Sequence, residues 1–143
     1  GVVVTNENHT RAAGVVAESF AVKVYAGAGA TEALGPSIAS QSIGEEQFGP
    51  GLTAIPIEGA PAGEIALHAQ ADGGSLIIGD ALINMGSYGF TFLPAKYCRN
   101  QKQMRRALRK LLDYRFERIV FAHGLPIVEQ AEPRLRELLE TGV

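Results

Sequence analysis

The sequence predicts an α/β fold, and three stretches of the chain indicate it. Residues 1–25 have the pattern of a strand, a helix and a second strand, which is typical of a β-α-β unit with parallel strands. Residues 52–78 contain three apolar runs separated by turn signals, as in antiparallel strands. Residues 99–141 show helix, strand and helix patterns in succession. The chain therefore combines parallel and antiparallel strands with helices.

The first third of the chain begins with the β-branched run GVVVT at residues 1–5, which predicts a buried strand. The segment from His9 to Phe20 has small and apolar residues at helical spacing, and Val22–Tyr25 predicts a second strand. Residues 27–51 are rich in Gly, Ala, Ser and Pro. We expect loop and short strands there, with one helical turn at Thr31–Leu34.

The middle third predicts an antiparallel meander. Leu52–Ile57, Glu64–Gln70 and Ser75–Ile78 are apolar or alternating, and the sequence Asp-Gly-Gly at 72–74 is a hairpin turn signal. Residues 84–97 contain two glycines and a proline, so we expect a long loop there. Long loops in compact domains are often functional.

The last third predicts an amphipathic helix at Arg99–Tyr114, a strand at Arg118–Ala122 and a final helix at Glu129–Thr141 that Gly142 ends. Residues 99–110 hold six of the thirteen Lys and Arg residues. A face that binds phosphate or nucleic acid is conceivable there, but a solvated helix face is favoured because no aromatic side chains are interleaved.

Length and composition restrict the class of protein. With 143 residues, the chain is expected to form a single domain, 1–143. The formal net charge of −2 gives no field that would attract nucleic acid or an anionic membrane, and no apolar run approaches the roughly 20 residues that cross a bilayer. The only cysteine, Cys98, cannot form an internal disulfide, which favours a reducing, cytoplasmic location.

Three predicted strands end in side chains that can bind a metal. His9, Asp80 and His123 each follow such a strand, and ligands gather at strand ends in α/β sheets. Two imidazoles and a carboxylate with an open position would suit hydrolytic zinc or iron. Each residue alone also fits a plainer role: His9 at a helix start, Asp80 in a turn and His123 in a loop.

Two other groups of polar residues are expected on the surface. His68 lies in an alternating strand, where a cross-strand surface contact is favoured over metal ligation. Glu58 and Glu64 flank the turn at 59–63, and a solvated turn is favoured over a carboxylate pair.

Four segments, taken in order, resemble the metallo-β-lactamase superfamily: TNENHTRAA, IPIEGAPAGEIAL, SLIIGDALI and RIVFAHGLPI. The resemblance implies an αββα sandwich, with two sheets face to face and helices outside. It covers only the later part of that fold and is nearest to a bacterial branch with a depleted metal motif. Because the N-terminal strands of the family are absent from this chain, either upstream residues or a partner chain, as in a homo-oligomer, is expected to cover the exposed sheet edge.

The resemblance also implies a reduced metal site. The family motif His-x-His-x-Asp-His corresponds here to Val4, Asn6, Asn8 and His9, and the turn at 59–64 has no histidine. Every ligand of one of the two family metals is thus missing. The other metal site keeps His9, Asp80 and His123, so we expect one Zn or Fe ion at most, with no ion as the alternative.

Two functions follow from the resemblance. The first is a degenerate protein with one metal site at most and weak or absent hydrolase activity. The alternative is a mononuclear metal-dependent hydrolase of a small ester, amide, thioester or lactone. The expected partner is a small-molecule ligand, rather than nucleic acid or a membrane. The residues expected to bind it are Asn6, Asn8, Tyr88, Lys96 and Tyr97.

Overall fold

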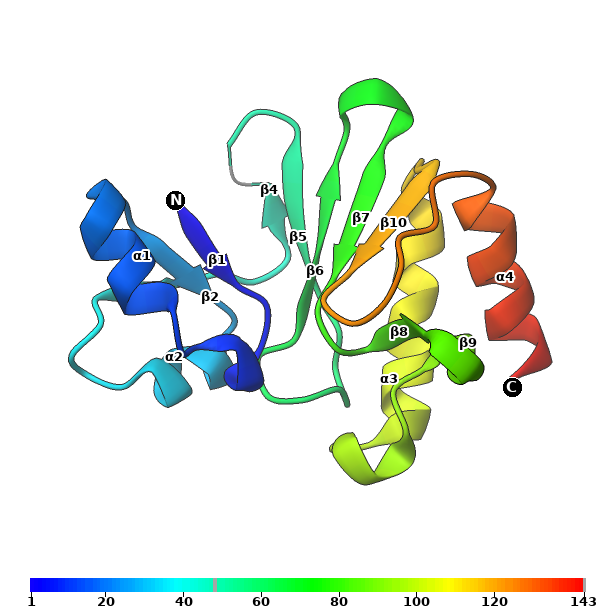
Figure 1. Cartoon of the computed structure of the whole chain (residues 1–143), viewed down its shortest axis with the longest axis horizontal. Helices are drawn as coiled ribbons and strands as arrows, with labels where there is room; N and C mark the ends of the chain where they lie inside the picture. The colour runs from blue at the N-terminus through cyan, green and yellow to red at the C-terminus, as the bar shows by residue number, and fades with distance from the viewer. Residues whose placement is uncertain (48, 143) are drawn as a thin grey trace.

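The computed structural model describes residues 1–47 and 49–142, which form four layers (Figure 1). Two helices, a small sheet, a large sheet and two further helices follow one another across the molecule. The order is that of the expected αββα sandwich. No helix among the described residues is long and apolar enough to cross a membrane.

The small sheet is parallel and contains the predicted β-α-β unit. Its strands, in spatial order, are β1 (Val2–Val4), β2 (Val24–Ala26) and β3 (Ser40–Ser42). Helices α1 (Ala13–Phe20) and α2 (Ala28–Leu34) cover its outer face, and the shared core consists of small apolar side chains such as Val4 and Ala30.

Two predictions for this part of the chain were wrong. The helix expected to begin at His9 begins at Ala13, because Glu7–His9 forms a separate 3-10 turn that the Asn6 side chain caps. The helical turn expected at 31–34 is the end of the longer helix α2, because its alanines are strong helix formers despite the neighbouring glycines.

The large sheet has the strand order β10-β7-β6-β5-β4. Its strands are β4 (Glu46–Gln47), β5 (Leu52–Pro56), β6 (Ile65–Ala69), β7 (Ser75–Ile78) and β10 (Arg118–Phe121). The predicted meander is confirmed, because β5, β6 and β7 pair antiparallel, whereas β10 pairs parallel to β7. Asp72 adopts the left-handed conformation in the β6–β7 turn, as the turn signal indicated.

The outer face of the large sheet carries the main core. Helices α3 (Gln101–Leu108) and α4 (Ala131–Thr141) pack on it with buried side chains that include Met104, Leu108 and Leu135. A 3-10 segment at Arg109–Asp113 continues α3. The solvated face expected for the basic helix is only partly correct, because Arg105 and Arg109 donate to the carbonyls of Gly142 and Leu139.

The expected long loop at 84–97 contains a hairpin instead. Strands β8 (Leu82–Met85) and β9 (Gly89–Phe92) pair antiparallel, and a 3-10 turn joins them. The hairpin lies beside β10, and Asn84 forms a parallel bridge with Gly124. This pairing places the start of the hairpin next to the loop that follows β10.

The expectation for His68 was also wrong, because its side chain is only 4% exposed. It lies on β6, a strand that is covered on both faces, by the core against the helices and by the cluster between the two sheets. Its Nε2 donates to the carbonyl of Arg115 over 2.8 Å, and its ring lies 5.0 Å from that of Tyr114. His68 is therefore a core histidine.

Candidate metal centre

His9, Asp80 and His123 meet at one edge of the fold. His9 ends the 3-10 turn after β1, Asp80 follows β7, and His123 follows β10. One ligand atom from each of the three residues lies within 4.8 Å of the other two. The prediction that these side chains are close enough to share an ion is confirmed, although 71 and 43 residues separate them along the chain.

The Asp80 carboxylate lies between the two imidazoles. Its Oδ1 is 3.1 Å from Nε2 of His9 and 3.0 Å from Nε2 of His123, and the residue is 5% exposed. Both distances suit hydrogen bonds, yet neither contact has the geometry of one, and Oδ1 has no hydrogen-bond donor. Three atoms whose lone pairs face one another at these distances require a proton or a cation between them.

Neighbouring side chains fix how two of these residues face the centre. Thr5 Oγ1 lies 3.0 Å from Nδ1 of His9, and when Nδ1 donates to it, Nε2 keeps its lone pair for an ion. Asn8 Nδ2 donates to Oδ2 of Asp80 over 3.0 Å, so only Oδ1 faces the histidines. Asp80 is thus arranged as a ligand through one oxygen.

This donor set fits a divalent metal ion. Two ligands about 2.0 Å from an ion at tetrahedral angles lie roughly 3.3 Å apart, close to the distances from Asp80 Oδ1 to the two imidazoles. Two imidazoles and a carboxylate suit zinc or iron. The His123 side chain is 47% exposed, so the ion would have access to solvent and to a ligand.

Glu64 lies beneath the centre and was missed as a site residue, because a solvated turn was expected. It is 3% exposed, and its Oε1 accepts hydrogen bonds from the backbone N–H groups of Asp80 and Ala81. Burial raises the pKa of Glu64 to about 7, against the opposing effect of these donors. Glu58, at the other end of the turn, is exposed and pairs with Lys110, as a solvated residue does.

Asn6 does not face a ligand, contrary to the sequence-based expectation. Its side chain has no exposed surface, because its Nδ2 donates to Oε2 of Glu64 and its Oδ1 accepts from the backbone N–H of Asn8. Asn6 therefore supports the loop that carries His9. Nothing in the sequence around Asn6 or Glu64 indicates this pairing, since 58 residues separate them.

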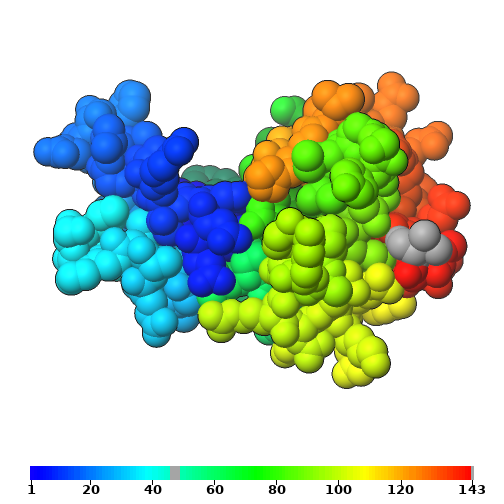
Figure 2. All heavy atoms as spheres, turned by 60° about the horizontal axis from the view of Figure 1, so that its bottom comes forward, coloured from blue at the N-terminus to red at the C-terminus, as the bar shows by residue number. Residues whose placement is uncertain are grey.

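The remaining expected ligand-binding residues lie in a pocket of about 530 Å³ that opens beside the centre. Its lining consists of Asn8, His9, Asp80, Ile83, Met85, Tyr88, Leu93, Pro94, Lys96, Tyr97 and His123. Lys96 Nζ lies 4.7 Å from the ring centroid of Tyr97. Figure 2 shows the N-terminal residues, in blue, against the green segment that supplies most of this lining.

Comparisons with known proteins agree with this fold. A family model described as "Metallo-beta-lactamase superfamily" matches residues 1–142. No curated protein sequence is significantly similar to the chain.

Solved structures show the same fold. A di-iron-bound form of TTHA1623 is 23% identical with a TM-score of 0.64, and the match covers 88% of this chain and 70% of that one. DIM-1 metallo-beta-lactamase is 15% identical with a TM-score of 0.72, and the match covers 100% of this chain and 70% of that one. TTHA1429, a metallo-beta-lactamase family protein from Thermus thermophilus, is 17% identical with a TM-score of 0.68, and the match covers 98% of this chain and 59% of that one. The chain thus spans 59–70% of these proteins.

Proposed function

The chain belongs to the metallo-beta-lactamase superfamily, and from that premise we propose that it holds one divalent metal ion and binds a small molecule beside it. His9, Asp80 and His123 would hold the ion, and hydrolysis would be weak or absent. The observation that supports this proposal most directly is the convergence of three ligand atoms within 4.8 Å of one another.

A single ion is proposed because the described residues supply only one group of ligands. The triad is the only cluster of three or more His, Cys, Asp or Glu side chains suited to a metal in that part of the chain. Glu64, a buried carboxyl group beneath the centre, already accepts from two backbone N–H groups and Asn6. The donor set suits zinc or iron, and the related TTHA1623 is described in a di-iron-bound form.

Weak hydrolysis is proposed because the pocket offers no spare general base. Among the described residues that line the pocket, Asp80 is the only carboxylate, and that group faces two imidazoles and accepts from Asn8. A bound ion would supply Lewis acidity for a carbonyl group and for water. The chain's own residues would bind and orient the ligand: Tyr88 and Tyr97 as apolar walls and Lys96 as the one lysine of the lining.

The second candidate is a mononuclear metal-dependent hydrolase of a small ester, amide, thioester or lactone. One observation favours it: the pocket of about 530 Å³ opens directly at His9, Asp80 and His123, so a bound acyl group would lie beside the ion. A half-exposed His123 also leaves room for an exchangeable ligand at the ion.

Metal analysis combined with turnover distinguishes the two candidates. We expect about one ion per chain after chelation and reconstitution with Zn²⁺ or Fe²⁺, and ester or lactone hydrolysis no faster than the metal ion in buffer. Hydrolysis that depends on added metal and disappears in His123→Ala would favour the second candidate. Two ions per chain, or none, would contradict the proposed site.

A further inference from the structure

We propose that Glu64 is a positioning residue for the metal centre, a role that rests on the proposed metal site. Its buried carboxyl group joins the loop that carries Asp80 to the loop that carries His9. It contacts neither the ion position nor the pocket that would hold the ligand.

On one side, Glu64 fixes the backbone at Asp80. Its Oε1 accepts from the N–H of Asp80 over 2.9 Å and from the N–H of Ala81 over 3.0 Å. Two N–H groups of consecutive residues that share one acceptor set the direction of the peptide chain at that point. The Asp80 side chain leaves the same backbone, so this contact also sets where its Oδ1 lies.

On the other side, Glu64 fixes the start of the turn that ends at His9. Its Oε2 lies 2.5 Å from Nδ2 of Asn6, and Oδ1 of Asn6 accepts from the N–H of Asn8 over 2.8 Å. The Asn6 amide is therefore oriented at both ends. Because His9 is the last residue of this 3-10 turn, its position follows from the position of Asn6.

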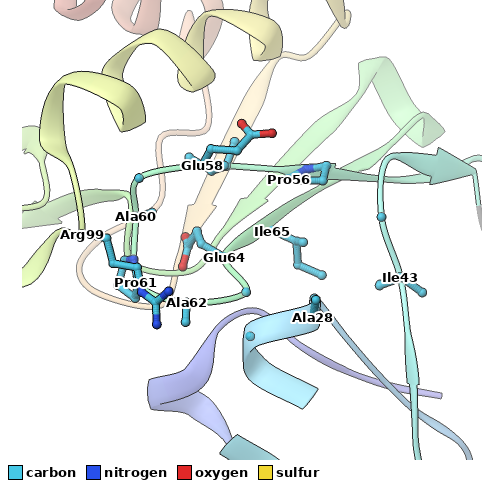
Figure 3. Close-up of a pocket in the computed structure, with 16 residues that line it drawn as sticks. Ala28, Ile43, Pro56, Glu58, Ala60, Pro61, Ala62, Glu64, Ile65 and Arg99 are labelled. Atoms are coloured by element: carbon cyan, nitrogen blue, oxygen red, sulfur yellow. The ribbon is translucent and has the colours of Figure 1, made fainter. Parts of the chain in front are cut away.

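The surroundings of Glu64 leave this carboxyl group little freedom to move. A Cβ atom on Gly79 would lie 2.9 Å from Oε1 of Glu64 and 3.0 Å from Nδ2 of Asn6, so only glycine leaves room for the pair. Figure 3 shows Glu64 inside the turn between Pro56 and Ile65, whereas Glu58 points outward from it. Burying a carboxyl group is unfavourable unless donors surround it, and three donors surround this one.

Exchanging the hydrogen-bond donor and acceptor between Asn6 and Glu64 tests the proposal. In Glu64→Gln, the side-chain NH₂ group faces the NH₂ group of Asn6, and turning the Asn6 amide would instead lose its contact with the N–H of Asn8. The double variant Asn6→Asp with Glu64→Gln restores every hydrogen bond: Gln Oε1 accepts from the two backbone N–H groups, and Gln Nε2 donates to the new aspartate. The control is Glu58→Gln, at the exposed end of the same turn.

Two measurements on the full chain at pH 8 are compared among these variants. The first is Co²⁺ affinity with the visible spectrum of the bound ion. We expect Glu64→Gln to bind Co²⁺ about 10- to 100-fold more weakly, the double variant to recover to within a few-fold of wild type, and Glu58→Gln to match wild type. The second is NMR of the histidine rings in metal-free protein, where the resonances of His9 should shift in Glu64→Gln and those of His68 should not.

The outcomes separate this inference from the proposed function. Wild-type protein that binds no Co²⁺ would refute the metal site, and the ring resonances would still decide whether Glu64 positions His9. Unchanged ring resonances in Glu64→Gln would overturn the positioning role, as would a double variant that recovers neither the affinity nor the spectrum. Circular dichroism verifies that each variant is folded.

Discussion

Replacing Gly79 by alanine adds a single methyl group at the point where the two loops of the metal centre meet. Gly79 precedes Asp80, and the new Cβ would lie 2.9 Å from Oε1 of Glu64, 2.9 Å from Oγ1 of Thr5 and 3.0 Å from Nδ2 of Asn6. Each of these atoms orients part of the site. The substitution therefore tests whether the close packing beneath the centre determines its geometry.

The size of the effect follows from these distances. Ordinary van der Waals contacts of a Cβ begin at 3.4 Å, so each of the three atoms must move by about 0.5 Å. Overpacking of this kind costs about 1–3 kcal/mol, which for a domain of this size lowers the melting temperature by roughly 3–10 °C. Because Thr5 orients His9 and Glu64 orients Asp80, we also expect metal affinity to fall by about tenfold.

The matched control is Gly44→Ala, because a Cβ at Gly44 would have no atom within 4 Å. Thermal unfolding of the metal-free proteins gives the stability, and Co²⁺ titration gives the affinity. Gly44→Ala should match wild type in both. A Gly79→Ala protein with wild-type melting temperature and wild-type affinity would refute the argument that packing beneath Asp80 holds the centre in place.

Three further predictions concern the centre and its pocket. His123→Ala should abolish bound metal, measured by elemental analysis, while changing the unfolding free energy by only about 1 kcal/mol, since His123 is a half-exposed loop side chain outside the core. The folded-state pKa of Glu64 is raised from 4.5 to about 7, so its contribution to stability is complete below pH 4.5 and is lost as the pH rises through 7. Urea unfolding of chelator-treated protein should therefore show a decline on the order of 3 kcal/mol between pH 5 and 8, and Glu64→Gln should remove this decline. Lys96→Ala should weaken the binding of small carboxylate ligands several-fold without changing Co²⁺ affinity, because Lys96 lines the pocket but is not a metal ligand.

The strands that carry the metal ligands could be predicted because their signals are local. The apolar runs at β1, β7 and β10 each end abruptly in a polar residue, and strand ends of this kind gather at one sheet edge. The hairpin of β8 and β9 could not be predicted in the same way. Its strands are short, the turn between them begins at Gly86 and β9 begins at Gly89, so turn residues dominate the local pattern. Its position also depends on contacts with the loop after β10.

The support beneath the site depends on contacts between distant residues, which the sequence does not display. Glu64 lies in a turn of glycine, alanine and proline that is typical of a solvated surface, and only its contacts with Asn6 and Asp80 explain its burial. His68 was misplaced for a related reason. The alternation of apolar and polar residues along β6 predicts one solvent-exposed face, but the second sheet and the helices cover both faces of this central strand.

The metal centre lies between the two sheets, so local unfolding of one part of the protein would separate its ligands. The smaller lobe, formed by β1, β2, α1 and α2, has a core cluster in which half of the buried residues are alanines. The larger lobe, formed by the large sheet with α3 and α4, has a core cluster of mostly large apolar side chains. Amide hydrogens in the smaller lobe should therefore exchange through local unfolding that leaves the larger lobe intact. Any such opening would carry His9 away from Asp80 and His123, so a bound ion would act as a cross-link that slows exchange most in β1 and β2.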